Sequence, residues 1–597
     1  MNLSATPRLP PDLIEECLGY LPARDLLRCQ LVTKSFQDQI KQNKRTRYKA
    51  RDELQRLSGI EERMAKLLYG KEHPLTTMCQ LGVPGAVVTD MHLVSTASGF
   101  LFFPLSAPGS FGMASIARYR LGAFSEGSDI IHLGRAASHL QLDAAEGLLF
   151  VLTMEDEGGF VHGKELYRHS LQAYDVHSLR PFSSPMAGLQ FFTSRIFQPA
   201  SSVSTRWGFL ATTSASRTFQ HANLEHFVRL YTPQDAGIFL NYRQIDWGYV
   251  LAGIHQYKIS EAEHVITRIL SLSAVLSLEL YATSAYLHLF AYSRGRAAGK
   301  SFDKAISVAR YALPTLPAGF TYVHAHMECS PVSLSSRDHR RREPHNILQD
   351  GEGILVVTLE TQFNGGLSLQ SSQEPPIDFS TLDLITAVCR ISYFDKQARY
   401  AWHKRCQDMA LPTAHFSYSR WAIQCLFWLP SLPNPPTVHS ICGYRLLVSE
   451  KTEPDAAHAQ HGAPGNQRLT IYDFSPYRIH QAIIAKDRNS KQPVPLAHDS
   501  GALGQQRLLK DDPDLQRFTT DTCGPQTPAL QQRAPEFVRE YRTKAPYIQA
   551  TRVIETDEPY VECIAHLSHE QLLLVYQRGQ REVGNEDEKG AEFWEEK

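Results

Sequence analysis

The sequence contains no Cys-x-x-Cys pair, although it has ten cysteines. They are scattered over positions 17, 29, 79, 329, 389, 406, 425, 442, 523 and 563. A disulfide scaffold or a structural zinc module would group its cysteines at short spacings. The pattern therefore predicts reduced and mostly buried thiols in an intracellular protein, located in the cytoplasm, the nucleus or both.

The chain also lacks a surplus of either charge, with 61 basic and 62 acidic residues and a formal net charge of −1. A nucleic-acid-binding chain usually has a strong basic surplus, so we expect no nucleic-acid partner. The hydrophobic fraction of 43% and the charged fraction of 21% are typical of a soluble globular protein. The length of 597 residues allows several compact units or one large β domain.

Long apolar helices are missing as well. Residues 1–11 have neither the charged start nor the apolar core of a secretory signal. Residues 269–292 contain one acid, Glu279, and no Lys or Arg, but their leucines alternate with Ser271, Ser273, Ser277 and Glu279. A period of two is typical of a strand and not of a lipid-facing helix. We expect no membrane partner.

Catalytic and ligand motifs are absent or incomplete. The segment 295–301 resembles a phosphate-binding P-loop but has three residues, not four, between its glycines. His569 and Glu570 begin a zinc-protease motif whose second histidine position is Leu573, and there is no G-x-S-x-G segment. The sequence thus predicts no catalytic residue, cofactor or metal, although distant loops can still assemble an active site.

A loose group of histidines and one cysteine is the nearest approach to a metal site: His324, His326, Cys329, His339 and His345. Their spacing fits no standard zinc frame, and the arginines at 337 and 340–342 would oppose a cation. We interpret the group as a solvated loop.

The N-terminal segment carries the strongest pattern in the chain. After Pro10 and Pro11, apolar residues recur at helical spacing as far as Leu21, and Pro22 ends that helix. Asp25 is a suitable N-cap for a second helix with Leu26, Leu27 and Leu31, and Thr33 for a third with Phe36 and Ile40. Three such short helices cannot bury all their leucines, and each aliphatic side chain that a partner covers gains about 1.5–3 kcal/mol.

In order and spacing, these residues resemble the F-box motif. The matching segments are Leu9-Pro10-Pro11-Asp12-Leu13-Ile14, Tyr20-Leu21-Pro22, Asp25-Leu26-Leu27-Arg28-Cys29, Leu31-Val32 and Ser35-Phe36. The combination with a long β-rich remainder is similar to the large F-box families of fungi.

The resemblance implies a substrate receptor of an SCF (cullin–RING) ubiquitin ligase, which belongs to the ubiquitin conjugation pathway. Its F-box would bind the Skp-type adaptor through Leu9, Pro10, Leu13, Ile14, Cys17, Leu18, Leu21, Leu26 and Leu27. The alternative is that residues 9–40 form a helical cap on the following domain.

From about Val83 onward the sequence consists of short apolar or alternating apolar and polar runs, separated by Gly, Pro, Ser, Asp and Asn. Strand candidates are Gly147–Thr153, Leu171–Tyr174, Phe227–Tyr231, Ile354–Leu359, Ala387–Tyr393, Arg445–Val448, Arg468–Tyr472 and Gln571–Tyr576. Several runs end in an aromatic residue and a polar turn, as at Tyr174-Asp175, Tyr393-Phe394-Asp395 and Tyr472-Asp473. With related endings at Tyr119, Tyr231 and Tyr292, the first four endings, from Tyr119 to Tyr292, are spaced by about 55 to 60 residues. Units of that length suggest an irregular β-propeller without Trp-Asp repeats, and a β-sandwich pair or an irregular barrel is the alternative.

The sequence therefore predicts a multidomain chain with small all-α F-box helices followed by a large, mostly-β domain. We divide it into an F-box at 1–48, a connecting helix at 49–82, a β-rich recognition domain at 83–580 with inserted loops at 451–467 and 486–545, and a disordered acidic tail at 581–597.

Three functions remain open. The preferred one is a non-enzymatic receptor whose β domain binds a target protein. The others are a β-propeller enzyme or ligand-binding protein with incidental N-terminal helices, and an F-box scaffold that acts outside ubiquitination.

Overall fold

A computed structural model gives the conformation of two N-terminal helices and most of the β region. It describes residues 11–20, 26, 29, 34–43, 46, 77–81, 87–88, 95–97, 100–106, 113–120, 128–143, 148–155, 160–161, 164–165, 167–181, 189–193, 203–206, 209–217, 224–231, 254–260, 262, 264–271, 273–291, 306–330, 352–363, 383–406, 412–429, 437–452, 466–475, 479, 516–519, 522–525, 527–544, 546–555, 560–567, 572–578 and 591–595.

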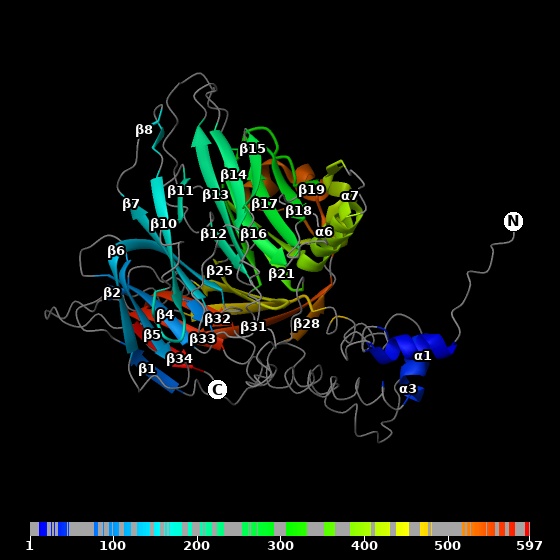
Figure 1. Ribbon diagram of the computed structural model, residues 1–597, viewed down its shortest axis with the longest axis horizontal. Coiled ribbons are helices and arrows are strands. Elements are labelled where there is room, and N and C mark those ends of the chain that lie inside the picture. The colour runs from blue at the N-terminus through cyan, green and yellow to red at the C-terminus, as the bar shows by residue number, and fades with distance from the viewer. Residues whose placement is uncertain are drawn as a thin grey trace.

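The N-terminal helices are α1 (Pro11–Tyr20) and α3 (Lys34–Gln42). Figure 1 shows them at one end of the molecule, apart from the sheets. Pro11 starts α1, as expected for a residue whose missing N–H costs nothing in the first turn. The rest of the described chain is dominated by antiparallel sheets.

The first large sheet has eight strands, all from the N-terminal part of the β region. Its strands are β2 (Val87–Val88), β3 (Ser95–Ala97), β4 (Phe100–Ser106), β5 (Met113–Arg120), β6 (Ser128–Asp143), β7 (Leu148–Glu155), β10 (Tyr167–Asp175) and β11 (Leu189–Thr193). The 16-residue strand β6 pairs with β5 through its first half and with β7 through its second half. It therefore joins two groups of strands into one sheet.

Three sheets follow in sequence order. The first contains β12 (Val203–Arg206), β13 (Phe209–Arg217), β14 (Leu224–Tyr231) and β15 (Ile254–Ser260). The second, here called the β16 sheet, contains β16 (His264–Ser271), β17 (Ala274–Leu280), β18 (Ala285–Ala291), β19 (Ile306–Ala312) and β23 (Ala414–Phe416). The third, the β20 sheet, contains β20 (Phe320–Cys329), β21 (Ile354–Phe363), β22 (Asp383–Arg390) and β24 (Leu426–Trp428).

The last two large sheets complete the β region. One contains β25 (Thr437–Cys442), β26 (Arg445–Thr452), β27 (Asn466–Asp473), β31 (Tyr547–Glu555) and β28 (Gln516–Thr519). The other contains β32 (Tyr560–Leu567), β33 (Leu572–Arg578), β34 (Ala591–Glu595) and β1 (Thr77–Leu81). Two small two-stranded sheets pair β8 (Phe160–Val161) with β9 (Lys164–Glu165) and β29 (Thr522–Cys523) with β30 (Thr543–Lys544).

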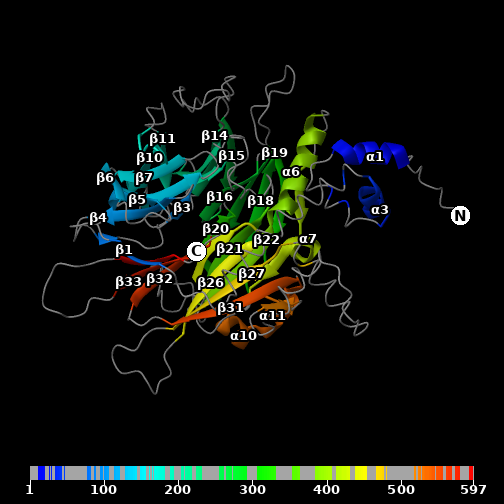
Figure 2. The same ribbon diagram turned by 90° about the horizontal axis from the view of Figure 1, so that it is seen from below.

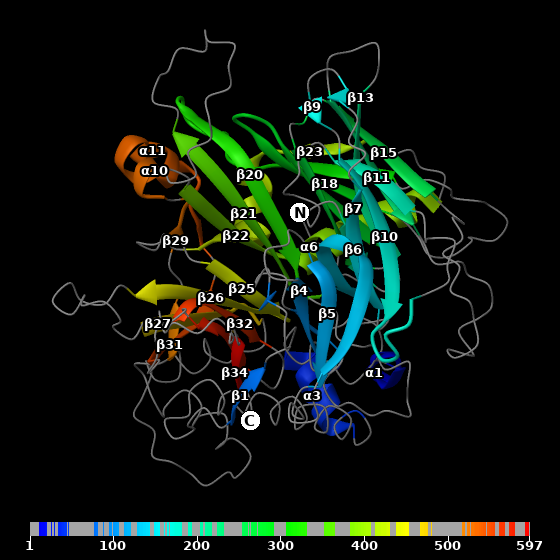
Figure 3. The ribbon, with the colours of Figure 1, turned by 90° about the vertical axis from the view of Figure 1, so that its left-hand side faces the viewer.

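Consecutive sheets contact one another, and the two ends of the β region meet. Strand β12 contacts β16, β16 contacts β20, and β25 contacts β32. Figure 3 shows the sheets following one another in sequence order around the molecule. The first strand, β1, pairs in antiparallel register with the last, β34, so that Cys79 lies opposite Phe593. The final sheet is thus built from both ends of the β region.

The main core lies between the β16 and β20 sheets. It contains alternate residues of β17 and β18, such as Leu276, Leu278 and Leu287, and residues of β21 such as Val357. Every residue of β16 and β17 is buried, so both faces of these strands are covered. Along β17 leucines alternate with polar residues, so the strand has an apolar face and a polar face. Both faces are buried.

Hydrogen bonds at Ser330 join the β20 sheet to the neighbouring β25–β26 turn. The Ser330 hydroxyl lies 2.5 Å from the carbonyl oxygen of Gly443 and accepts from the amide of Ile354 at 2.9 Å. Gly353 has a φ of +101°, and a Cβ there would lie 2.8 Å from Ser330 Oγ. Only glycine tolerates that backbone and that close approach without strain.

An insertion separates β22 from its partner β24. It contains α6 (Ile391–Cys406), β23 and α7 (Tyr418–Cys425). Strand β23 pairs in parallel with β19, so the insertion connects the β20 sheet to the β16 sheet. Figure 2 shows α6 and α7 on the side of the sheets that faces α1 and α3.

Four expectations from the sequence are wrong in detail. The strand expected at Ala387–Tyr393 ends at Arg390, and its Tyr393-Phe394-Asp395 ending belongs to α6. The β structure begins at Thr77, inside the range assigned to a connecting helix, and the acidic tail contains β34. These two strands, β1 and β34, pair with each other across the two ends of the β region, and local composition does not reveal such pairing.

The fourth difference concerns the expected loop at 486–545. It contains β28, β29, β30 and two short helices, α10 (Pro528–Arg533) and α11 (Pro535–Glu540). Thr527 caps α10 by accepting a hydrogen bond from the amide of Leu530 at 3.1 Å, and each helix begins with proline. Most of the expected loop at 451–467 lies outside the described residues.

Candidate functional site

The N-terminal helices close around a small apolar cluster. Leu18 of α1, Leu26 and Ile40 of α3 are buried, and Ile14 and Cys29 pack against them. Ile14 and Leu18 are four residues apart and therefore lie on one side of α1. The cluster fixes α1 against α3.

The C-terminal end of α3 is tied down by Thr46. Its hydroxyl lies 3.2 Å from the carbonyl oxygen of Ile40 and 3.3 Å from that of Asn43, and its amide donates to Asn43 Oδ1 at 3.1 Å. Thr46 is buried although it is polar. These bonds satisfy backbone groups that a helix end leaves without intrahelical partners.

The other side of α1 presents apolar side chains to solvent. Leu13 is 49% exposed, and Glu16 and Cys17 are exposed beside it. Leu13 and Cys17 are four residues apart, so they form one short stripe on the outer side of the helix. A large aliphatic side chain on such a stripe gains free energy when a partner covers it.

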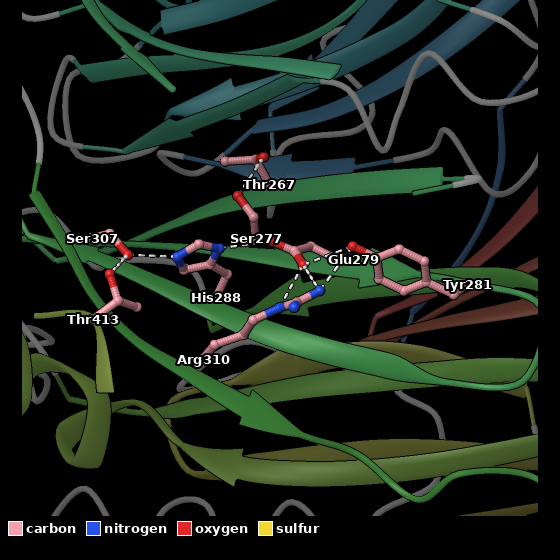
Figure 4. A network of polar contacts seen from close by, with 8 residues as sticks. All are labelled: Thr267, Ser277, Glu279, Tyr281, His288, Ser307, Arg310 and Thr413. Carbon is pink, nitrogen blue, oxygen red and sulfur yellow. Dashed lines mark hydrogen bonds and ion pairs between the residues drawn. The ribbon is translucent and has the colours of Figure 1, made fainter. Parts of the chain in front are cut away.

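A second concentration of polar side chains lies on the buried polar face of the β16 sheet (Figure 4). His288 Nδ1 lies 2.7 Å from Glu279 Oε1, and Arg310 donates to Glu279 Oε2 from Nε at 2.9 Å. The Arg310 guanidinium also donates to the Tyr281 hydroxyl at 2.8 Å. We call these residues, with Ser307 and Thr413, the Glu279 network.

The network continues to the edge of the sheet. His288 Nε2 lies 2.7 Å from Ser307 Oγ, which accepts from the Thr413 hydroxyl at 2.8 Å. A carboxylate only accepts, so His288 Nδ1 donates to Glu279, while Nε2 and the Ser307 hydroxyl lie within hydrogen-bond distance of each other. The series Ser307–His288–Glu279 therefore has the order of a nucleophile, a base and a carboxylate.

Glu279 carries the negative charge of the network and pairs with Arg310. Burial by itself would raise the pKa of this carboxyl, but the hydrogen bond and charge of His288 and the charge of Arg310 leave it below its usual value of 4.5. Burial, followed by the Glu279 charge, raises the pKa of Tyr281 to about 12. Glu279 is therefore an ionised acceptor at neutral pH, and Tyr281 a neutral hydroxyl.

A family comparison now decides the identity of the N-terminal helices. Residues 7–48 match the model of the F-box domain. The chain contains an F-box domain. The match spans the cluster of Leu18, Leu26 and Ile40 and the exposed stripe of Leu13 and Cys17.

Comparison of the whole chain with solved structures gives only distant likenesses. The crystal structure of the WD40 domain of SCAP from fission yeast is similar at 7% identity and a TM-score of 0.27, covering 88% of this chain and 97% of that one. The crystal structure of polysaccharide lyase Uly1 is similar at 8% identity and a TM-score of 0.29, covering 89% and 94%. No curated protein matches the chain. At these TM-scores the two structures do not define the fold of the β region.

The nine residues expected to contact an adaptor fall into four groups. Leu13 and Cys17 are exposed, Ile14 is partly buried, and Leu18 and Leu26 are buried inside the F-box. The remaining four lie outside the described residues: Leu9, Pro10, Leu21 and Leu27. The helical spacing of these apolar residues predicted that they lie on helices. It did not predict which of them face the inside of the F-box and which face solvent.

The remaining sequence expectations have mixed outcomes. Seven of the ten cysteines have described side chains. Four of these, Cys389, Cys425, Cys442 and Cys523, are buried, and none of the seven forms a disulfide. Burial raises the pKa of Cys389, Cys425 and Cys442, so their thiols stay protonated and unreactive. The described part of the chain holds no group of three metal-ligating side chains, and no described helix is long and apolar enough to cross a membrane.

Of three further segments singled out in the sequence, one is partly described and two lie outside the described residues. His324, His326 and Cys329 lie on strand β20, whereas His339, His345 and the neighbouring arginines lie outside the described residues. The P-loop-like segment 295–301 and the pair His569-Glu570 also lie outside them.

The Glu279 network was missed at the sequence level. Its members come from strands β17, β18 and β19 and from the segment before β23, so no linear motif joins them. One signal was available, because Ser277 and Glu279 alternate with leucines. An acid on a strand without nearby Lys or Arg indicates a partner elsewhere in the chain.

Proposed function

We propose that this F-box protein is the substrate-receptor subunit of an SCF (cullin–RING) ubiquitin ligase. The F-box binds a Skp-type adaptor, and the β region binds a target protein. The receptor contributes proximity between the target and a ubiquitin-charged enzyme, without chemistry by its own side chains.

The exposed stripe on α1 carries the adaptor-binding part of the proposal. Leu13 and Cys17 face solvent on the outer side of a helix whose inner side is fixed by a closed apolar cluster. A partner that covers the stripe gains hydrophobic free energy without rearranging the F-box. In this proposal Leu18 and Leu26 act indirectly, by holding α1 in place.

The target-binding part rests on the architecture of the β region, which we propose is an irregular propeller. Groups of four or five strands follow one another in sequence. Because the long strand β6 belongs to two of these groups, the six large sheets divide into seven groups. The first strand of one group contacts the first strand of the next at β12–β16, β16–β20 and β25–β32. Pairing of β1 with β34 supports closure of the last group by the N-terminal strand.

Association in cells tests the proposal. The full-length protein should co-purify with both the adaptor and a cullin, and Leu13→Asp with Cys17→Asp should abolish both associations. Leu18→Asp is unsuitable because Leu18 is buried and its charge would unfold the F-box. Adaptor binding without a cullin would support a scaffold role instead, and unchanged association of the double variant would contradict the assignment.

The Ser307–His288–Glu279 series is the observation that favours an enzyme. Three features support a structural role instead. Register pairing alone places Ser277, His288 and Arg310 in one row across the sheet. His288 stacks on Phe290 with ring centroids 4.2 Å apart, and Ser307 Oγ already accepts from Thr413. A fluorophosphonate probe should leave Ser307 unlabelled, whereas labelling that His288→Ala abolishes would restore the enzyme hypothesis.

A further inference from the structure

The insertion between β22 and β24 is far longer than its connection requires. Ala387–Cys389 of β22 pair directly with Leu426–Trp428 of β24, and antiparallel neighbours can be joined by a turn of about 2–5 residues. Here residues 391–425 intervene. Long connections on a rigid sheet scaffold are where binding residues concentrate.

Packing explains the inner half of this insertion. Ile391, Phe394 and Ala398 of α6 are fully buried in the main core. Trp421 of α7 donates its indole N–H to the carbonyl oxygen of Ala312 at 2.8 Å. These contacts, with the β19–β23 pairing, hold the β16 and β20 sheets together.

Packing does not explain the outer half of α6. Lys396, Arg399, Tyr400 and His403 are exposed, with Lys404 partly exposed beside them. Spacings of three, four and seven residues place these five on one side of the helix, here called the α6 face. Tyr400 is 60% exposed, and the Lys404 ammonium lies 5.7 Å from its ring centroid. The fold gains little from an aromatic ring in this position.

The α6 face is positively charged because the one acid of α6 points inward. Asp395 is 6% exposed, accepts from the hydroxyls of Ser271 and Ser273, and pairs with Arg399 Nε at 2.7 Å. Among the described residues, none forms an ion pair with Lys396 or Lys404. Residues 391–425 contain five Lys or Arg and two Asp, a surplus of three in a chain whose net charge is −1.

We propose that the α6 face is a docking surface for an acidic segment of the target protein, a segment rich in Asp and Glu that also carries an apolar side chain. The proposal rests on the receptor function above and names the chemistry of what the receptor binds. Carboxylates pair with Lys396, Lys404 and the outer edge of Arg399, and the apolar side chain packs on the Tyr400 ring.

Composition favours a protein over a nucleic acid as the occupant. Tyr and Arg are enriched where proteins bind proteins. A nucleic-acid site usually extends over a larger basic surface, with more than one aromatic ring for stacked bases. Helix α6 also lies on the side of the β region toward α1 and α3 in Figures 1 and 2. A segment docked there is held on the adaptor side of the receptor.

Fluorescence anisotropy with the full-length protein tests the proposal. The probe is a fluorescein-labelled peptide of twelve Asp and Glu residues around a central Leu, titrated at about 150 mM salt. We expect saturable binding that Lys396→Glu with Lys404→Glu weakens by about tenfold or more and Tyr400→Ala by about fivefold or more. The same peptide with Asn and Gln in place of the acids should not bind.

A matched control separates local from global charge. Arg120→Glu with Arg180→Glu changes the net charge equally at exposed positions of β5 and of the turn after β10, and should leave the dissociation constant within about twofold. No binding of the acidic peptide, or equal binding by the two double variants, would overturn the proposal. Tighter binding of a single-stranded oligonucleotide of the same charge would also overturn it.

The adaptor serves as an internal reference in these titrations. All α6 variants should bind a purified Skp-type adaptor as the wild type does. Loss of peptide binding with intact adaptor binding concerns the α6 face alone. Absence of adaptor binding in the wild type would contradict the receptor function, whatever the peptide does.

Discussion

Glu279 is held by three side chains from its own sheet, His288, Arg310 and Tyr281. Its side chain is 3% exposed, and that of Arg310 25%. The formation of a buried ion pair adds little net stability, because desolvation offsets the Coulomb attraction. Removing one member is different, since the remaining charge stays buried without compensation.

Glu279→Gln should therefore lower the free energy of unfolding by about 3–5 kcal/mol. The amide would present donors to the Arg310 guanidinium and remove the charge that it faces. Urea unfolding at pH 7 measures the loss. Ser277→Ala is the matched control on the same face of the same strand, because it removes only the hydroxyl contact with Thr267 at 3.0 Å and should cost about 1 kcal/mol. A loss no larger than that of the control would contradict the role of the network.

The stability that Glu279 contributes should depend on pH, and the same two variants test this. The pKa of Glu279 is lower in the folded state than its usual 4.5, so its contribution is fully present above that pH and is lost as the pH falls through the folded-state pKa. The stability difference between wild type and Glu279→Gln should be constant from about pH 7 to 5 and should narrow below about 4.5. Ser277→Ala titrates no group, so its difference should not change, and a Glu279→Gln difference that widened on acidification would reverse the assigned shift.

At the scale of elements, the α6–β23–α7 insertion shows how tertiary packing overrides local pattern. Tyr393-Phe394-Asp395 is separated from the end of strand β22 by two residues and has strand-like composition. In the structure Phe394 packs with Tyr311 of β19 at 5.3 Å and Trp421 of α7 at 6.2 Å between ring centroids. Those contacts join residues far apart in sequence, so period and propensity could not predict them.

Trp421 and Ile423 of α7 provide a matched pair of substitutions that tests the packing of this helix. Trp421 is fully buried and donates to Ala312, whereas Ile423 is 66% exposed. Trp421→Ala should destabilise the protein by about 3–5 kcal/mol, and Ile423→Ala by less than about 0.5 kcal/mol. Thermal unfolding measures both, and similar shifts in Tm would show that α7 does not pack as described.

At the scale of the whole molecule, the first and last strands of the β region lie in one sheet. Most strand candidates were confirmed, including Gly147–Thr153 as β7 and Arg468–Tyr472 as β27, because alternation and turn residues are local signals. Strand β34 was not predicted, since residues 581–597 read as an acidic tail and its partner β1 lies at the other end of the β region. In the F-box, helical spacing likewise predicted apolar positions but not which of them stay exposed.

The register of β1 and β34 can be tested through a natural cysteine. Cys79 lies opposite Phe593, so Phe593→Cys should form a disulfide with Cys79 under mild oxidation. Trp594→Cys should not form one, because successive residues of a strand point to opposite faces. Mass spectrometry of peptides identifies the crosslink, and its absence in Phe593→Cys would argue against closure of the β region by its first strand.

Adaptor binding tests the central claim most directly. The measurement is a titration of the full-length protein with a purified Skp-type adaptor, for the wild type, Leu13→Asp with Cys17→Asp, and Lys41→Glu with Gln42→Glu. The last variant adds charge at exposed positions of α3, away from the α1 stripe. We predict saturable binding by the wild type and the α3 variant, and a loss of at least about 100-fold in the α1 variant, because two charges would be buried against an apolar partner. Equal affinity of all three proteins, or no binding by the wild type, would contradict the account.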